Sequence, residues 1–205
     1  MTSNHYFDRV ASDWDRMRRG FFSEEVREKA ISIAGVRSDA VAADIGAGTG
    51  FITEGLVNRG LRVIAVDRSG AMLAGMRRKL AGVSGVDYLV GEVTELPISD
   101  ESVDYAFANM CLHHIELPYR AIKEMARILR PGGKLIITDL DEHSHDFLRI
   151  EHHDAWLGFK SEHMKEWLAE AGLREVSVKS LGENCCAQPD CGCASVGIFI
   201  ATGLK

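Results

Sequence analysis

The sequence predicts an α/β fold: a mostly parallel sheet of seven strands with helices on both faces and an antiparallel hairpin of strands at its C-terminal end. Three observations support this fold class. From residue 40 onward, short apolar runs alternate with helical patterns, as in a parallel sheet covered on both faces. The run at residues 41–45 leads through a glycine-rich turn into a helical pattern. The last two apolar runs have no helix between them, so we expect them to pair antiparallel.

The N-terminal segment is predicted to be helical. Large residues recur at helical spacing over residues 4–19 and predict one amphipathic helix: Tyr6, Val10, Trp14 and Met17. We expect Gly20 to end this helix and Ser23 to be the N-cap of a second one, with acidic residues in its first turn. Residues 1–38 are therefore expected to form a helical lid.

The remaining elements follow in order along a single domain of residues 1–205. Strands are predicted over residues 41–45, 62–66, 87–90, 104–109 and 134–138, and helices over residues 51–58, 69–80 and 118–129. A helix over residues 161–171 precedes two strands over residues 175–179 and 196–201. The two strands form the predicted terminal hairpin.

The composition is that of an ordinary globular protein, with 205 residues, 46% hydrophobic and 26% charged. The net charge of -6 gives no electrostatic reason to expect nucleic acid or an anionic membrane as a partner. No apolar run approaches the ~18 residues of a membrane span, and the polar N-terminus has no signal-peptide core. We expect a cytoplasmic protein, and the sequence does not indicate its oligomeric state.

The glycine-rich turn is the first candidate binding site. Gly46, Gly48 and Gly50 alternate there, and small residues at the start of a helix let a ligand approach the backbone N–H groups. In the dinucleotide-binding pattern the third glycine would stand one position later, where this chain has Phe51. This spacing disfavours a nicotinamide-dependent oxidoreductase. Taken alone, the turn is also compatible with an ordinary connection between a strand and a helix.

Five sequence blocks in order extend this pattern. They are Asp44 to Gly50, Val63 to Asp67, Gly91 to Pro97, Val103 to His114 and Ala126 to Gly133. In these blocks the chain resembles the class I S-adenosylmethionine-dependent methyltransferases, especially the small-molecule branch similar to the ubiquinone and menaquinone biosynthesis enzymes. The resemblance implies a Rossmann-like fold, with residues 39–140 as the cofactor-binding core and residues 141–205 on the acceptor side.

The resemblance also implies a site for S-adenosylmethionine, with S-adenosylhomocysteine as the product, at Asp44, Gly46, Gly48, Gly50, Asp67, Met72, Glu92, Val93 and Asn109. The glycines would admit the methionine half, whose ammonium Asp44 would bind, and Asp67 would accept hydrogen bonds from both ribose hydroxyls. Met72 would lie over the adenine, and Glu92 or the Val93 backbone would contact its amino group. Solvated carboxylates and a core methionine are the alternatives.

Methyl transfer from a sulfonium is an in-line displacement, which requires a positioned nucleophile and exclusion of water but no catalytic dyad. Enzymes of this fold that methylate the amino groups of bases resemble one another in an Asn/Asp-Pro-Pro-aromatic motif after the fourth strand. Positions 109–112 read Asn-Met-Cys-Leu instead, so we expect a small-molecule acceptor and no nucleic acid. His113 or His114 is a candidate general base, and packing in a connecting segment is the alternative.

The cysteines are the least ordinary feature of the composition. Four of the five lie within nine residues, at Cys185, Cys186, Cys191 and Cys193. If residues 175–179 run parallel to the core strands, a loop over residues 181–194 leaves from the carboxyl ends of the strands, where ligands of open α/β sheets bind. The cysteines would then share the cofactor face with Cys111, His113 and His114.

The chemistry of this cysteine cluster is open at this point. Its spacing differs from the paired Cys-x-x-Cys of zinc ribbons, but thiolates are preferred ligands of soft metals. We hypothesise that Cys111, Cys186 and Cys191 hold a thiol-bound acceptor such as arsenic(III), as arsenite methyltransferases, which are similar in fold, do with cysteines at other positions. A structural zinc site, free thiols, and a cofactor-binding protein that senses or stores a soft metal are the alternatives.

Overall fold

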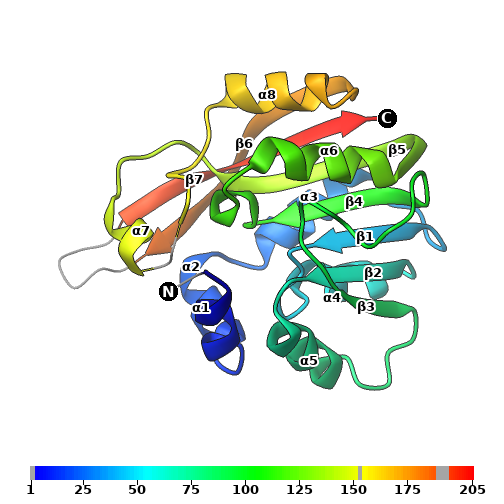
Figure 1. The fold of residues 1–205 in the computed structure, drawn as a ribbon, viewed down its shortest axis with the longest axis horizontal. Helices are drawn as coiled ribbons and strands as arrows, with labels where there is room; N and C mark the ends of the chain where they lie inside the picture. The colour runs from blue at the N-terminus through cyan, green and yellow to red at the C-terminus, as the bar shows by residue number, and fades with distance from the viewer. Residues whose placement is uncertain (1–2, 152–153, 188–193) are drawn as a thin grey trace.

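The computed structural model describes residues 3–151, 154–187 and 194–205. Within these residues, seven strands form one sheet in the order β3-β2-β1-β4-β5-β7-β6 (Figure 1). β1 to β5 are parallel, β7 is antiparallel to β5, and β6 is antiparallel to β7. The strands are β1 Val41–Ile45, β2 Arg62–Asp67, β3 Val86–Val90, β4 Val103–Asn109, β5 Leu129–Leu140, β6 Arg174–Ala187 and β7 Ala194–Leu204. The predicted fold class is confirmed.

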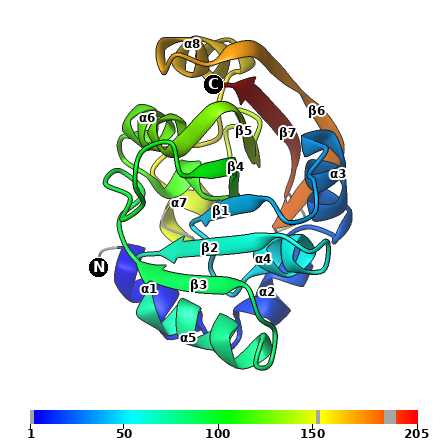
Figure 2. The ribbon, with the colours of Figure 1, turned by 90° about the vertical axis from the view of Figure 1, so that its right-hand side faces the viewer.

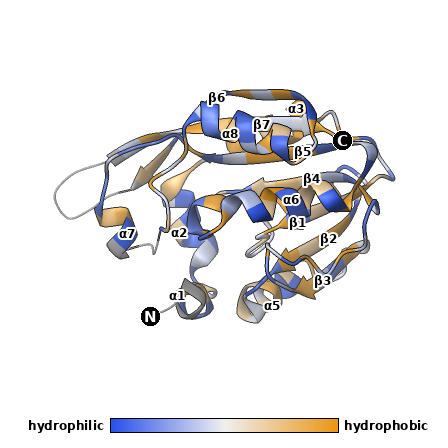
Figure 3. Cartoon of the chain, turned by 45° about the horizontal axis from the view of Figure 1, so that its top comes forward, coloured by the Kyte–Doolittle hydropathy of each residue, from blue (hydrophilic) through white to orange (hydrophobic). Residues whose placement is uncertain are grey.

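Helices cover both faces of the sheet (Figure 2). They are α1 Ser3–Val10, α2 Trp14–Phe21, α3 Glu25–Ala34, α4 Phe51–Val57, α5 Gly70–Lys79, α6 Pro118–Ile128, α7 Phe147–Glu151 and α8 Ser161–Glu170, with a short 3-10 helix, η1 Leu112–His114. α3 and α4 pack on one face, whereas α6 and α8 pack on the other. Figure 3 shows hydrophilic and hydrophobic residues together on α6 and α8, as expected of helices with one covered side.

Alternation along the strands divides the core between these two layers. In β4, Tyr105 and Phe107 join the cluster under α3 and α4, while Ala106 and Ala108 join the cluster under α6 and α8. Successive side chains of a strand point to opposite faces, so each apolar run of the sequence supplies both layers. This explains why short continuous apolar runs predicted the central strands closely.

The N-terminal prediction of one helix ended by Gly20 is wrong. A turn at residues 11–13 separates α1 from α2, and α2 continues through Gly20 to Phe21. Asp13 accepts hydrogen bonds from the N–H groups of Arg16 and Met17 and so begins the second helix. These bonds are made by the Asp13 carbonyl, and the Asp13 side chain makes no capping hydrogen bond, so the break rests on the backbone turn and not on a side-chain cap. The next helix starts one residue later than predicted, because its N-cap is Glu24 and not Ser23, whose hydroxyl instead accepts a hydrogen bond from the Glu25 N–H.

The C-terminal hairpin is longer than predicted. β6 continues to Ala187, and Cys185 and Cys186 pair with Val196 and Ser195 of β7. The expected loop over residues 181–194 is therefore wrong for residues 181–187. The sequence obscured this continuation because the register shifts between Ser180 and Glu183, where Gly182 has a φ of 71°. Such a bulge interrupts the alternating pattern of a strand without ending it.

The carboxyl ends of the parallel strands lie together at one end of the sheet, and α1, α2 and α7 cover this end (Figure 1). Ligands of open α/β sheets bind at this edge. No helix in the part of the chain that the structure describes is long and apolar enough to cross a membrane.

Candidate functional site

The glycine-rich turn between β1 and α4 lies directly against the end of β2. Gly46 and Gly48 have φ values of 67° and 53°, which a residue with a Cβ adopts only with strain. The Gly48 N–H donates to Asp67 Oδ2 at 2.8 Å, and the Ser69 N–H donates to Asp67 Oδ1 at 2.8 Å. Burial raises the pKa of Asp67, although these two N–H donors oppose the shift. A carboxylate with two acceptor oxygens thus stands beside the loop.

This loop borders a cleft of about 760 Å³, part of which is open to solvent. A cleft of this size suits a small-molecule ligand. Seven predicted cofactor residues line it: Gly46, Gly48, Asp67, Met72, Glu92, Val93 and Asn109. We call it the first cavity. The structure brings these residues together from the turn after β1, from β2, α5 and β4, and from the segment after β3.

Asp44 and Gly50, two other predicted cofactor residues, do not line this cavity. Asp44 is 1% exposed, and its Oδ2 accepts hydrogen bonds from the backbone N–H and the hydroxyl of Thr53, at 2.9 and 2.6 Å. Gly50 precedes α4 with a φ of 88°, and a Cβ there would meet Met76 Cγ at 2.6 Å. Asp44 anchors the first turn of α4, and Gly50 allows α4 and α5 to pack closely.

The raised pKa of Asp44 predicts that the stability of the folded protein depends on pH. Burial raises its pKa from 3.8 to about 6, against the opposing hydrogen bonds from Thr53. Between these values the folded chain binds a proton that the unfolded chain does not, so this contribution to stability falls as pH rises. Asp44→Asn keeps an oxygen acceptor and removes the charge. We therefore expect the variant to gain stability relative to the wild type between about pH 4 and pH 7, by at most about 3 kcal/mol.

Urea unfolding of both proteins at several pH values measures this difference directly. Acidic groups that do not interact with Asp44 contribute equally to both proteins and cancel. A difference in unfolding free energy that stays constant across the range would contradict the assignment.

The N-terminal helices are tied to the cofactor loop. The Ser69 hydroxyl donates to Asp8 Oδ1 at 2.6 Å, and the Thr49 hydroxyl donates to Asp15. Trp14 Nε1 lies 3.6 Å from the position that a Cβ on Gly48 would occupy. α1 and α2 therefore cover the first cavity.

Arg18 is a buried cation in this cover. It is 4% exposed, lines the first cavity and lies over the Phe51 ring, with its guanidinium carbon 4.4 Å from the ring centre. Its guanidinium also donates to Glu24 and to the Phe22 carbonyl, while its Nε has no hydrogen-bond partner among the described residues. A buried donor without a partner is costly, and an anionic ligand group in this cavity would satisfy it.

A second cavity of about 510 Å³ adjoins the first and is also partly open. Its lining is largely apolar and comprises Tyr6, Phe7, Trp14, Phe21, Phe22, Met110, His113, His114, Leu140, Leu148, Asp154 and Cys185. Five residues line both cavities and form a shared wall: Phe7, Trp14, Phe22, Met110 and His114. The two spaces are thus neighbouring compartments.

His113 is held by the carboxylate at the end of β5. Its Nδ1 lies 2.6 Å from Asp139 Oδ1, and Asp139 Oδ2 accepts the Leu112 N–H at 2.9 Å. Burial lowers the pKa of His113, but the charge of Asp139 and its hydrogen bond outweigh burial and raise the pKa overall. Asp139 therefore fixes both the position of η1 and the orientation of the His113 ring.

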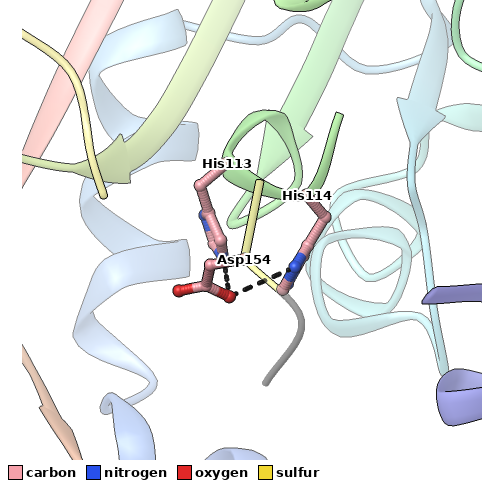
Figure 4. Close-up of side chains that lie close together, drawn as sticks. All are labelled: His113, His114 and Asp154. Carbon is pink, nitrogen blue, oxygen red and sulfur yellow. Dashed lines mark ion pairs between the residues drawn. The ribbon is translucent and has the colours of Figure 1, made fainter. Parts of the chain in front are cut away.

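Asp154 reaches the same cavity from a distant part of the chain. The His113 carbonyl accepts the N–H groups of Ala155 and Trp156 at 2.9 and 3.0 Å. The Trp156 indole donates to the Ile115 carbonyl at 3.0 Å. Burial raises the pKa of Asp154 to about 6, an effect that the nearby His113 opposes. These backbone contacts bring a third ionisable side chain beside His113 and His114 (Figure 4).

The described cysteines stand in different parts of the site. Cys111 lines the first cavity and lies against Gly46, where an added Cβ would overlap its Sγ. Cys185 lines the second cavity, whereas Cys186 lines neither. Burial raises the pKa of the Cys185 thiol to about 12 and raises that of Cys111 as well, so both thiols are protonated at neutral pH. Cys191 and Cys193 lie outside the described residues.

Several residues of the site carry no signal that sequence reasoning could use. Phe7, Arg18 and Asp154 line the cavities. Phe7 and Arg18 belong to helices whose docking position follows from tertiary contacts, and no motif surrounds Asp154. The only local hint was the amphipathic pattern of the N-terminal segment, which did not indicate what it covers.

Comparison with known proteins adds independent findings. Residues 43–137 match a family described as methyltransferase domain. The demethylmenaquinone methyltransferase of Clavibacter sepedonicus is 32% identical over 138 residues, which cover 65% of this chain and 56% of that protein. The chain thus spans about half the length of the curated relatives it matches.

Solved structures match over more of the chain. A methyltransferase in complex with the Haloferax volcanii Trm112 activator has a TM-score of 0.80 at 21% identity, covering 97% of this chain and 96% of that one. Phosphoethanolamine N-methyltransferase 2 of Haemonchus contortus, with phosphomonomethylethanolamine and S-adenosylhomocysteine bound, has a TM-score of 0.73 at 18% identity, covering 87% and 52%. These likenesses show the shared fold.

Proposed function

We propose that this chain, whose residues 43–137 match a methyltransferase-domain family, transfers a methyl group from S-adenosylmethionine to a small, mostly apolar acceptor. The observation that carries this proposal is the pair of cavities with a shared wall. Methyl transfer requires a donor and an acceptor in contact and shielded from water. Two adjoining compartments under one cover suit that requirement.

The residues of the first cavity fit S-adenosylmethionine. The Asp67 carboxylate would accept hydrogen bonds from the ribose hydroxyls, and Met72 and Val93 would contact the adenine. Arg18, whose Nε has no hydrogen-bond partner among the described residues, would pair with the carboxylate of the methionine half. When bound, this cofactor supplies an electrophilic methyl group on a sulfonium.

The second cavity would hold the acceptor. Its aromatic and aliphatic lining favours a largely apolar molecule, and His113 and His114 offer polar contacts at one side. The relative in Clavibacter sepedonicus is named for demethylmenaquinone, so quinols and phenols are the first acceptors to test. Trp14 and Phe7 would exclude water from the junction, and we infer that α1 and α2, rather than all of residues 1–38, act as the lid that opens for both ligands, because α3 packs in the core on the sheet.

The two cavities can be tested separately. Met72 lines the first cavity and Phe21 the second, and neither lines both. Met72→Ala should raise the Kd for S-adenosylhomocysteine about tenfold, because it removes buried apolar contact. Phe21→Ala should leave that Kd within about twofold and raise the acceptor KM instead. Calorimetry gives the first quantity, and release of S-adenosylhomocysteine with a panel of quinols, phenols, thiols and arsenite gives the second.

If Phe21→Ala weakened cofactor binding as much as Met72→Ala, the division into two compartments would be refuted. Cofactor binding without turnover on any acceptor would favour the alternative of a cofactor-binding protein that senses or stores a soft metal. Failure of the wild type to bind S-adenosylhomocysteine would remove both functions.

A thiol, or arsenic(III) bound by thiolates, is a second candidate acceptor because Cys185 lines the second cavity. The raised pKa values of Cys185 and Cys111 oppose this candidate, because both thiols would have to lose protons on ligation. Mass spectrometry of the products formed from S-adenosylmethionine and arsenite, with Cys185→Ser and Cys186→Ser as variants, tests it. Methylarsenic that is absent, or equal in all three proteins, would remove this candidate.

A further inference from the structure

The three ionisable side chains at one side of the second cavity converge on a single point (Figure 4). One ligand atom from each of His113, His114 and Asp154 lies within 4.8 Å of the others. Asp154 Oδ1 is 3.3 Å from His114 Nδ1 and 3.9 Å from His113 Nε2. From these contacts we propose that His113, His114 and Asp154 bind a divalent transition-metal ion, a role that methyl transfer itself does not require.

The distances are close to those of a ligated ion. Metal–nitrogen and metal–oxygen bonds of about 2.0–2.2 Å at tetrahedral angles separate the ligand atoms by roughly 3.3 Å. One of the two separations from Asp154 already has this value, and the other exceeds it by a fraction of an ångström. The third separation, between the two imidazole nitrogens, is within 4.8 Å, so ligation would require rotation of the imidazole rings toward a common point.

Asp154 supplies a second, independent observation. The residue is 7% exposed, and its Oδ1 accepts no hydrogen bond from any residue that the structure describes. Burying a carboxylate oxygen without a hydrogen bond is costly, and such oxygens in proteins are normally hydrogen-bonded or coordinate a metal. A cation between Asp154 and the two imidazoles would remove this cost.

Asp139 prepares His113 for ligation. When His113 Nδ1 donates to Asp139 Oδ1, as their separation of 2.6 Å indicates, the lone pair of its Nε2 faces Asp154. Metal-binding histidines commonly donate their other ring N–H to a carboxylate, which fixes the ring and its tautomer. Asp139, which is fully buried, provides this arrangement.

The donor set selects the class of ion. Two imidazole nitrogens and one carboxylate oxygen suit borderline ions such as Zn²⁺, Fe²⁺ and Co²⁺, whereas Mg²⁺ and Ca²⁺ prefer oxygen alone and thiophilic ions prefer sulfur. The site is therefore distinct in chemistry from a cysteine cluster. Cys185 lines the same cavity but does not belong to this group of ligands.

Three protein ligands leave a coordination position open, as in catalytic zinc sites. All three ligands line the second cavity, so this position faces the space for the acceptor. An oxygen of the acceptor would bind there and be oriented by the ion. This use of the ion rests on the proposed function, whereas binding of the ion does not.

The test uses the full-length, reduced and metal-free protein, titrated with Co²⁺ and Zn²⁺ alone, without cofactor or acceptor. We expect one ion per chain and a visible Co²⁺ spectrum without the charge-transfer band that thiolate ligands produce. Asp154→Asn and His114→Gln should each weaken Zn²⁺ binding more than about 100-fold, because loss of a ligand exceeds the 10–100-fold cost of losing its hydrogen-bonded neighbour.

Asp146→Asn and His163→Gln are matched controls, since both residues are exposed and lie outside the cluster. They should bind Zn²⁺ as the wild type does. If Asp154→Asn fails to fold by circular dichroism, His114→Gln and the wild-type spectrum still decide the outcome. No uptake by the wild type, a thiolate band, or affinity unchanged in the ligand variants would each overturn the proposal. None of these outcomes would bear on the proposed methyl transfer, because the test measures metal binding only.

Discussion

Asp67→Ala is expected to weaken binding of S-adenosylhomocysteine by at least about 100-fold. The carboxylate stands at the end of β2 beside the glycine loop, and each of its oxygens accepts one backbone N–H, which leaves a second lone pair on each oxygen for a diol. Two hydrogen bonds to a charged acceptor contribute about 3 kcal/mol or more, which corresponds to a 100-fold change in Kd. Calorimetric titration of both proteins measures the difference.

Asp87→Ala is the matched control, because Asp87 is an exposed carboxylate on the neighbouring strand β3. It should bind S-adenosylhomocysteine with the affinity of the wild type. Asp67 also accepts backbone N–H groups from Gly48 and Ser69, so Asp67→Asn, which retains an acceptor oxygen, separates loss of charge from loss of loop order. Unchanged affinity in Asp67→Ala would exclude the first cavity as the cofactor site.

Gly158→Ala, which only adds a methyl group, is expected to destabilise the protein strongly. Gly158 has a φ of 70°, and an added Cβ would overlap the Asp141 carbonyl and lie 2.8 Å from the Leu140 carbonyl oxygen. These are backbone atoms at the end of β5 and cannot rotate away. Left-handed strain and overpacking together cost about 4 kcal/mol. Urea unfolding of the variant and the wild type measures the loss.

Gly82→Ala separates the two contributions. Gly82 has a φ of 87°, but nothing lies within 4 Å of an added Cβ. This control should lose only the conformational cost of about 1–2 kcal/mol. Equal losses in the two variants would show that the close approach at Gly158 has no energetic consequence. Because residues 155–159 carry Asp154 to the second cavity, Gly158→Ala should also disturb that side of the cavity.

The parts of the fold that followed from the sequence are those that local patterns determine. Central strands such as β1 are buried on both faces, so a short apolar run followed by the Gly46 turn located them. The break before Trp14 was missed because helical spacing of apolar residues continues across it. The extension of β6 to Cys185 was missed because a bulge interrupts its alternation, and its pairing with β7 depends on contacts distant in sequence.

The residues of the candidate site likewise divide into those that the sequence predicted and those that it did not. Asp67 ends β2 and Met72 follows it, so the topology agrees with the family resemblance in directing both residues to the carboxyl ends of the strands. Asp44 has the expected place but bonds to Thr53, which only the geometry of the first turn of α4 reveals. Asp154 stands about 40 residues from His113 and reaches it through backbone hydrogen bonds, which leave no pattern in the sequence.

A crystal structure of the protein with S-adenosylhomocysteine would show directly whether the first cavity holds the methyl donor. We predict the ribose hydroxyls on Asp67, the adenine against Met72, and the sulfur directed at the shared wall of Met110 and His114. The second cavity should remain open beside that sulfur for an acceptor. A ligand bound elsewhere, or one that fills the second cavity and leaves no space next to its sulfur, would contradict the account.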